Sequence, residues 1–329
     1  MSATPTTIIA LGAGRMGRGI AHAFAYAGHP VWLLDIKPRT SEAFAALREE
    51  ALAEIDASLH ALADWGMFER VECAGVIHRI QVAGLADAPA VLAAADIVFE
   101  GVPELIEAKR TALDLASQYM RPDAILASTT SAHRVTELAA LCRQPARFLN
   151  AHWLNPAPII PLVELSVHAG TDPAVIARMR TLLERMGKVP VLCSASAGYL
   201  VPRLQTLVMN EAARMIEEGV ATAEDIDRAT RYGFGFRYAA MGLVEFMDYG
   251  GNDILYHASR YLARELGPRY EAPEIINRFM HEGRLGLKTG SGFFDYSTID
   301  EPAYRKEALG RILAMLRHQG LVRPPGSAL

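Results

Sequence analysis

The segment that most constrains the fold is a glycine turn near the N-terminus. It reads Gly12-Ala-Gly14-Arg-Met-Gly17 and follows directly after an apolar, β-branched run at residues 7–11. A helical pattern comes next, and a second apolar run at residues 31–34 ends in Asp35. The order strand, glycine turn, helix, strand and acid predicts a unit that binds a dinucleotide. The alternative is a glycine turn with a purely structural role.

Each part of this unit has its own physical task. We expect Gly12 to permit a tight turn, Gly14 to let the backbone approach a pyrophosphate, and Gly17 to let the helix pack on the strand. The N-terminus of the helix favours phosphates, because its free N–H groups carry partial positive charge. Asp35 is placed to accept hydrogen bonds from ribose hydroxyls and to repel a 2′-phosphate, which favours NAD over NADP.

Strand and helix patterns continue to alternate along the first 193 residues. Further strands are predicted at 80–83, 96–100, 124–128 and 189–193. We therefore predict an α/β fold: a mostly parallel, Rossmann-type sheet in residues 1–193, followed by an all-α domain in residues 194–329. Helices of that second domain are expected at 199–218, 222–232, 240–248, 253–265, 274–281 and 304–319, with Thr222 as an N-cap.

A histidine and a glutamate twelve residues apart form the candidate chemical centre. His152 and Glu164 lie in two apolar segments separated by the turn 155–158. If these segments are neighbouring strands, the turn brings the carboxylate beside the imidazole. A carboxylate on one ring nitrogen fixes the tautomer and raises the basicity of the other, which makes a general base. The alternative is a buried histidine paired with a carboxylate for structure alone.

Three polar residue types fall at the ends of predicted strands. Glu100 ends one strand, Ser131 follows another, and His152 stands at the end of a third. Ligands of such sheets bind outside the carboxyl ends of the strands. We therefore expect these side chains at one mouth of the sheet.

Composition excludes several classes of function. The 329 residues carry a formal net charge of −4, so we expect no general attraction to nucleic acid or to an anionic membrane. Three cysteines without a Cys-x-x-Cys pair predict a reduced compartment, no disulfide frame and no metal site. We expect no membrane span and no leader segment, and hence a cytoplasmic protein.

Taken in order, these motifs resemble the L-3-hydroxyacyl-CoA dehydrogenase family, including its lambda-crystallin, gulonate dehydrogenase and carnitine dehydrogenase branches. The resemblance covers nearly the whole chain. It rests on the glycine turn, Asp35, Glu100-Gly-Val-Pro-Glu104 with Lys109, Ser128-Thr-Thr-Ser131, His152-Trp-Leu-Asn155-Pro with Glu164, Ala197-Gly-Tyr-Leu-Val-Pro-Arg203, residues 220–227 and residues 286–296.

The resemblance implies a role for each matching residue. His152 is similar to the family's base and Glu164 to its partner, while Ser131 matches the serine that binds the substrate hydroxyl, and Asn155 the asparagine that supports the site. Glu100 and Lys109 resemble residues near the nicotinamide ribose. The NAD cofactor is expected on Gly12, Gly14, Arg15, Met16, Gly17 and Asp35. The family's helical domain also makes a dimer contact, so a homodimer is implied.

Two departures from the family pattern bear on the substrate. Pro202 stands where the family has an asparagine that contacts substrate, and proline has neither a side-chain donor nor an N–H. Arg237 belongs to a Phe-Arg-Tyr segment shared with branches whose substrates are not CoA thioesters. Arg237 is expected either to hold a substrate carboxylate or to make an ordinary salt bridge. The glycines at 286–292 open no strand–helix unit, so we expect a structural turn that packs Phe293 and Phe294.

The resemblance implies an NAD-dependent oxidoreductase that converts the C3 hydroxyl of a substrate to a ketone. One substrate hypothesis is a short 3-hydroxyacyl-CoA, which the resemblance to the family favours. The other is a free 3-hydroxy acid of the gulonate or carnitine kind, which the acidic segment 40–77, Pro202 and Arg237 favour. A non-catalytic, crystallin-like NAD(H)-binding protein is the alternative from another class, and the intact set of Ser131, His152 and Glu164 argues against it.

Overall fold

The computed structural model describes residues 5–323 of the chain, which divide into two compact units. One unit runs to Val208 and the other begins at Met209. The boundary therefore lies inside helix α8 (Val201–Glu217). The assignment of residues 1–193 and 194–329 to cofactor and substrate domains stays a prediction.

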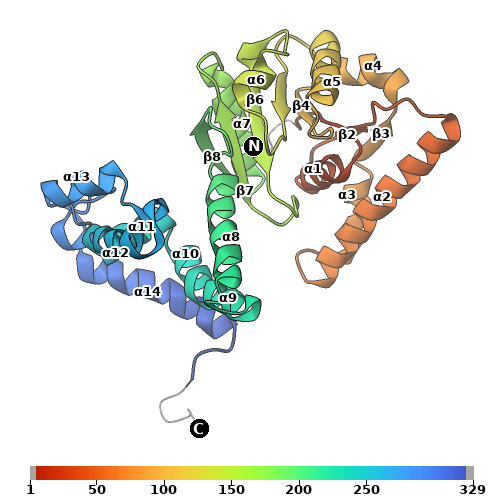
Figure 1. The fold of residues 1–329 in the computed structure, drawn as a ribbon. Helices are drawn as coiled ribbons and strands as arrows, with labels where there is room; N and C mark the ends of the chain where they lie inside the picture. Colours follow the sequence, from red (N-terminus) through yellow and green to blue (C-terminus); the bar gives the residue numbers. More distant parts are fainter. Residues whose placement is uncertain (1–4, 324–329) are drawn as a thin grey trace. The chain divides into compact units, whose positions relative to one another are not determined.

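The first unit is built on an eight-stranded sheet with the order β3-β2-β1-β4-β5-β6-β7-β8 (Figure 1). All neighbouring strands are parallel except β6 and β7, which are antiparallel because a short connection joins them directly. The predicted mostly parallel, Rossmann-type sheet is confirmed. The strands are β1 (Ile8–Leu11), β2 (Val31–Leu34), β3 (Ile80–Ala83), β4 (Ile97–Glu100), β5 (Ile125–Ser128), β6 (Phe148–Trp153), β7 (Leu162–Val167) and β8 (Val189–Ser194).

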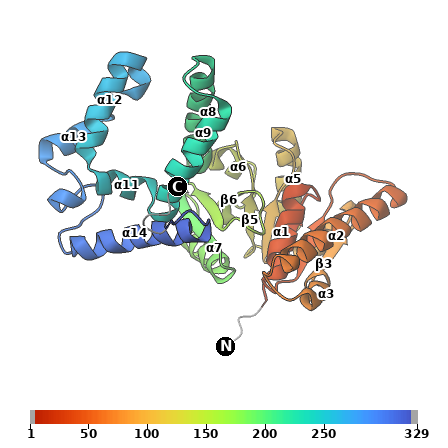
Figure 2. The same ribbon diagram turned by 90° about the horizontal axis from the view of Figure 1, so that it is seen from below.

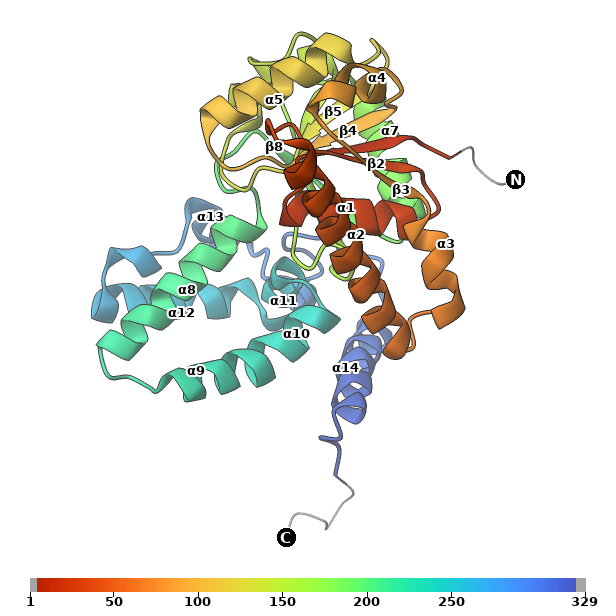
Figure 3. The same ribbon diagram turned by 90° about the vertical axis from the view of Figure 1, so that its right-hand side faces the viewer.

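Helices cover both faces of this sheet, because alternate strand residues point to opposite sides. Ile8 and Ala10 of β1 lie in the core beneath α1, α2, α3 and α7, whereas Ile9 and Leu11 lie in the core beneath α4, α5 and α6. Figure 3 shows strands between α4 and α5 on one side and α1 and α2 on the other. The helices are α1 (Arg15–Tyr26), α2 (Ser41–Asp64), α3 (Cys73–Ile77), α4 (Ala88–Ala93), α5 (Ile106–Tyr119), α6 (Val135–Ala139) and α7 (Pro173–Arg185).

The second unit is helical, as predicted. Thr222 caps α9 by accepting a hydrogen bond from the backbone N–H of Asp225, which confirms its expected role. Helix α14 packs on α10 and lies beside α11 (Figure 2), where the Tyr304 hydroxyl donates to Glu245 over 2.6 Å. The helices that follow α8 are α9 (Ala223–Ala229), α10 (Phe236–Ala240), α11 (Leu243–Gly250), α12 (Asn252–Leu266), α13 (Glu274–Glu282) and α14 (Glu301–His318).

Several helix boundaries in this unit differ from the prediction; α14, for example, begins at Glu301 and not at 304. The helix expected at 222–232 ends as α-helix at Ala229 and continues as a π-helix over Thr230–Gly235 into α10. The helix expected at 240–248 begins only at Leu243. The shift has a local cause, because the Glu245 carboxylate accepts the backbone N–H of Gly242 and so fixes the start of α11 there.

The glycine-rich turn at 286–292 wraps a buried carboxylate. Asp248 accepts hydrogen bonds from the backbone N–H groups of Phe293 and Phe294. A Cβ atom at Gly292 would lie 2.1 Å from Asp248 Oδ1, so no larger residue fits there. The turn is thus structural, as expected. Phe293 packs on Phe279, and Phe294, although half exposed, contacts the ring of Tyr296 edge-on.

In residues 5–323, no helix is long and apolar enough to cross a membrane. The same residues hold no group of three or more histidine, cysteine and carboxylate side chains arranged to bind a metal ion.

His22 of α1 gives the first unit a testable pH dependence. Its side chain is 2% exposed, and burial, with the charge of Lys188 as a second cause, lowers its pKa from 6.5 to about 4. Between these two values the unfolded chain binds a proton that the folded chain does not, so acid destabilises the fold. We expect about 2–3 kcal/mol of stability to be lost between pH 7 and pH 4.5 through this group.

Urea unfolding of the wild type and of His22→Leu at both pH values measures this loss. The variant should show a smaller difference in unfolding free energy between the two pH values. An unchanged difference would show that His22 is not the group responsible.

Candidate active site

A cavity of about 410 Å³ opens at the carboxyl edge of the first unit's sheet. Its walls come from the turn after β1, the end of β2 and the loops after β4, β5 and β6, which is where ligands of such sheets bind. Seven predicted site residues lie together in its lining: Gly12, Gly14, Arg15, Met16, Asp35, Ser131 and Asn155. Gly17, Glu100, Lys109, His152 and Glu164 do not line this cavity.

The three glycines of the turn meet different surroundings. Gly12 has a φ of +110°, and a Cβ there would lie 3.0 Å from the Gly101 carbonyl oxygen. At Gly17 a Cβ would lie 1.8 Å from the Gly12 carbonyl oxygen, so helix and turn touch directly. A Cβ at Gly14 would meet no atom beyond its chain neighbours within 4 Å. The protein itself therefore fills the space around Gly12 and Gly17, whereas Gly14 faces open space at the cavity.

The end of the cavity at β2 carries charges of both signs. Asp35 is 4% exposed, and Arg39 donates a hydrogen bond from its Nε atom to the Asp35 carboxylate. Lys37 and Arg39 both line the cavity with Asp35. Ribose hydroxyls need a carboxylate as acceptor, and Asp35 supplies one at this end. The two cations beside it weaken the repulsion of a 2′-phosphate, so the charges at this end do not by themselves select NAD over NADP.

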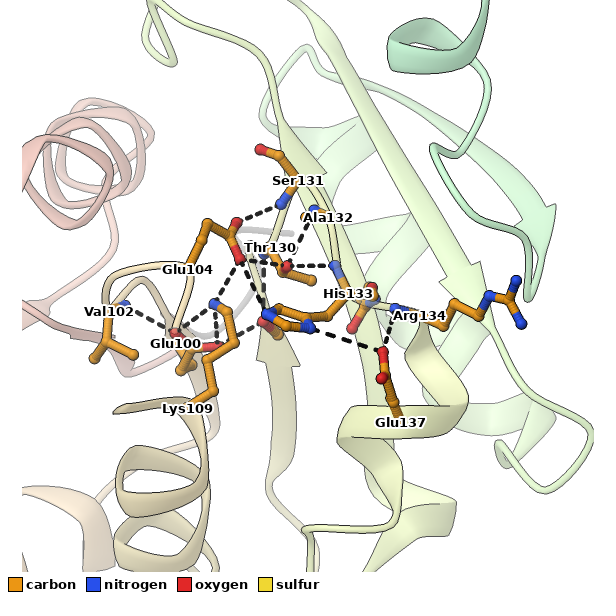
Figure 4. Close-up of polar contacts among 12 residues, drawn as sticks. Glu100, Val102, Glu104, Lys109, Thr130, Ser131, Ala132, His133, Arg134 and Glu137 are labelled. Carbon is orange, nitrogen blue, oxygen red and sulfur yellow. Dashed lines mark hydrogen bonds and ion pairs between the residues drawn. The ribbon is translucent and has the colours of Figure 1, made fainter. Parts of the chain in front are cut away.

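A connected group of charged side chains lies beside the cavity (Figure 4). Glu100 and Lys109 are completely buried, with 3.2 Å between Lys109 Nζ and each Glu100 carboxylate oxygen. Glu100 also accepts the backbone N–H of Val102 and the hydroxyl of Ser128. This pair stands behind the wall of the cavity rather than in it. Its role near the nicotinamide ribose therefore stays a prediction.

Glu104 belongs to this charged group and lines the cavity, although it was not among the predicted site residues. It accepts hydrogen bonds from the Thr130 hydroxyl and the Ser131 backbone N–H, at 2.7 and 2.6 Å. Burial alone would raise the pKa of Glu104, but these two bonds and the charge of Lys109 outweigh it and lower the pKa. In the sequence, the feature that could have indicated a site role for Glu104 is its place in a loop directly after a strand, next to Pro103.

His152 and Glu164 face each other across β6 and β7, as the turn spacing predicted. His152 Nδ1 lies 2.7 Å from Glu164 Oε2, and the two residues are direct partners in the strand register. The other carboxylate oxygen accepts the backbone N–H groups of Leu200 and Val201 at the start of α8. Burial alone would raise the pKa of Glu164, but its bonds to His152, Val201 and Leu200 outweigh that effect and lower the pKa.

An ionised Glu164 assigns the tautomer of His152. The carboxylate can only accept, so the ring proton sits on Nδ1 and the lone pair on Nε2. In residues 5–323 the hydrogen bond of the His152 ring is the one from Nδ1 to Glu164, and no protein group bonds to Nε2. The imidazole is therefore prepared to take a proton from a ligand.

Tyr199 holds the ring of His152 from one face and was not anticipated as a site residue. The two rings are stacked, with 5.0 Å between centroids and 8° between planes. The Tyr199 hydroxyl donates to the Thr130 carbonyl and accepts from Asn150 Nδ2, at 2.8 and 2.9 Å. Tyr199 thus links the histidine to the loop that carries Ser131.

The two departures from the family pattern have local explanations. Pro202 is the second residue of α8, where the missing N–H removes no helical hydrogen bond. Arg237 is exposed, and its guanidinium carbon lies 5.3 Å from the centre of the Phe246 ring. Within the described part of the chain it makes no ion pair, so the salt bridge expected as the alternative is not present.

The glycine turn, the acid after the second strand and the paired histidine together define a dinucleotide-dependent oxidoreductase. Comparison with known families agrees. Residues 7–196 match the model of the 3-hydroxyacyl-CoA dehydrogenase NAD-binding domain, and residues 198–296 match that of the C-terminal domain. The chain belongs to the 3-hydroxyacyl-CoA dehydrogenase family and is an NAD-dependent oxidoreductase acting on a hydroxyl group.

Individual relatives differ in the substrates that their names give. A probable 3-hydroxybutyryl-CoA dehydrogenase of Bacillus subtilis is 31% identical, covering 88% of this chain and 96% of that protein. The 5-formyl-3-hydroxy-2-methylpyridine 4-carboxylate 5-dehydrogenase of Mesorhizobium japonicum is 29% identical, over 94% of this chain and 97% of that protein. The crystal structure of a 3-hydroxyacyl-CoA dehydrogenase from Archaeoglobus fulgidus matches with a TM-score of 0.75 and 32% identity. The match covers 96% of this chain and 100% of that chain.

The buried pair behind the cavity gives a stability prediction. Lys109→Met leaves the Glu100 carboxylate buried without its cation, which should cost about 3–5 kcal/mol of unfolding free energy. The matched control is Arg110→Met, since Arg110 pairs with Glu107 at the surface and should contribute less than about 1 kcal/mol. Urea unfolding at pH 7 measures both. Equal losses of unfolding free energy in the two variants would show that the buried pair contributes no more than the exposed one.

Proposed function

We propose that this protein reversibly oxidises the C3 hydroxyl of a 3-hydroxyacyl compound, with His152 as the general base. The observation that supports this most directly is the 2.7 Å contact between His152 Nδ1 and Glu164, with Nε2 left without a protein partner. Ser131 and Asn155, at the edge of the cofactor cavity, supply polar groups beside the same strand ends. General acid–base catalysis of this kind contributes roughly 10²–10⁴-fold.

The chain's residues divide the work as follows. NAD, when bound, supplies the hydride acceptor. Gly12, Gly14 and the first residues of α1, Arg15 and Met16, hold its diphosphate, and Asp35 accepts from its ribose. His152 takes the hydroxyl proton at Nε2, and Glu164 stabilises the imidazolium that forms. Ser131 shares the substrate hydroxyl with His152, and Asn155 supports the site.

The charge of α2 bears on which substrate class is used. CoA carries several phosphate charges, and the exposed face of α2 is acidic. Two of its acids, Glu50 and Glu54, pair with Arg18 of α1, which removes that cation as a free phosphate partner. This pattern favours a free 3-hydroxy acid, whereas the names of most relatives favour a CoA thioester. The pyridine carboxylate in the name of the Mesorhizobium relative is consistent with a family member acting on a free acid.

The assembly and location are part of this proposal. Several apolar side chains of the helical unit are more than half exposed: Met209, Val220, Ile254 and Tyr261. These exposed apolar side chains are available for a contact between two copies of the chain, which is the homodimer that the family resemblance implies. Cys73, Cys142 and Cys193 are free thiols, which supports a reducing, cytoplasmic environment.

The role of His152 is tested by His152→Gln. Glutamine keeps a polar side chain but cannot act as a base near neutral pH, so turnover should fall by about 10²–10⁴-fold. NADH binding, followed by its fluorescence, should stay nearly unchanged because His152 does not line the cavity. His78→Gln, at an exposed helix end, serves as the control. Wild-type turnover in His152→Gln would remove His152 from the mechanism.

The substrate class is tested with acetoacetyl-CoA and a panel of free 3-hydroxy acids. We expect kcat/KM to favour the free acids by an order of magnitude or more. If Arg237 holds their carboxylate, Arg237→Met should raise KM about 10–100-fold, because a charge-assisted hydrogen bond is lost. Arg231→Met is the matched exposed control. A tenfold preference for the thioester would reject the free-acid assignment, and NADH binding without any turnover would favour a non-catalytic role.

A further inference from the structure

Lys188 is a buried cation that the proposed reaction does not use. It stands between α7 and β8, and its side chain is almost fully buried. Its Nζ atom donates to the carbonyl oxygens of Ala157 at 2.7 Å and Ile160 at 2.9 Å, and Pro158 O lies at 3.4 Å. In the part of the chain that the structure describes, no carboxylate pairs with it. Carbonyl dipoles therefore hold this charge, together with the ring of Trp153, whose centre lies 5.5 Å from Nζ.

The three carbonyl groups belong to the connection at 154–161 between β6 and β7. This connection contains three prolines, which have no backbone N–H to donate. The backbone bonds of Ile159 and Ile160 within it both end on the Pro156 oxygen. Carbonyl groups turned inward without a donor are costly. Lys188 supplies donors that the connection cannot supply from its own backbone.

The same connection carries the parts of the candidate site. It joins the strands on which His152 and Glu164 face each other, and its residue Asn155 lines the cofactor cavity. On the side of α1, Ala157 packs so closely that a Cβ on Gly19 would lie 3.1 Å from the Ala157 Cβ. The connection is thus held between the cofactor-side helix and Lys188.

We propose that Lys188 is a positioning residue, whose ammonium group fixes the β6–β7 connection and so sets His152, Glu164 and Asn155 relative to the cofactor cavity. The inference rests on the roles proposed above for these residues. An ammonium suits the task because it presents three donors at one point. The neighbouring His22 adds no second charge at neutral pH, because burial lowers its pKa to about 4.

The test compares Lys188→Met, which keeps the length but removes the donors, with Lys188→Arg, which keeps donors and charge. Val91→Ala is the control for a general loss of stability, since Val91 lies in the core on the other face of the sheet. Four quantities are measured: kcat, KM, the NADH dissociation constant, and the low-field proton NMR signal of His152 Nδ1. That signal is assigned by its loss in His152→Gln.

We expect Lys188→Met to lower kcat about 10–100-fold through misplacement of the base, with the NADH dissociation constant within about twofold of the wild type. The Nδ1 proton signal should shift or disappear, and Lys188→Arg should recover most of both losses. Val91→Ala should lower the melting temperature without changing the signal. If Lys188→Met does not fold, Lys188→Gln, with two donors and no charge, replaces it under the same criteria.

The proposal is overturned if Lys188→Met keeps the wild-type kcat and proton signal, or loses activity only in proportion to its folded fraction, as Val91→Ala would. The NMR signal separates this failure from failure of the proposed function. If the wild type turns over no substrate tried, an unchanged signal in Lys188→Met still rejects the positioning role, and a lost signal still supports it.

Discussion

The candidate site depends on one buried carboxylate that serves two partners. Glu164 binds the imidazole of His152 with one oxygen and two backbone N–H groups at the start of α8 with the other. A buried charge is tolerated only when it is bonded in this way. Because these bonds keep Glu164 ionised, the proton stays on Nδ1, and Nε2 is left as the atom proposed to act as the base. Strand register enforces the contact, since a slip of one residue would turn one partner to the other face of the sheet.

Much of this arrangement could be predicted from the sequence, because it follows from periodicity and short-range geometry. The glycine turn at residues 12–17 stands between a strand and a helix, and that context alone fixes where it lies in a parallel sheet. The pairing of His152 with Glu164 follows from two apolar segments and a proline-containing turn. The position of Ser131 at the same edge follows from the rule that parallel strands end together.

The remainder could not be predicted, because it depends on side chains from distant segments. Glu100 and Glu104 look alike in sequence, yet packing buries one with Lys109 and turns the other toward the cavity. Stacking of Tyr199 on His152 needs the chain to return after β8, and nothing in the local pattern of Tyr199 indicates it. The predicted start of α11 was wrong for a similar reason. The hydrogen bond from the Gly242 backbone N–H to Glu245 decides where this helix begins, and hydrophobic spacing does not reveal that bond.

The unequal surroundings of the three glycines have a consequence for reading natural variants. A replacement at Gly17 collides with backbone, and one at Gly12 adds strain from its positive φ, so both should lower the amount of folded protein. Gly14 has an ordinary backbone conformation and empty space around it. An alanine there should leave the protein abundant and correctly folded but poor at retaining its dinucleotide. Defects of abundance and defects of affinity would then arise two residues apart in one motif.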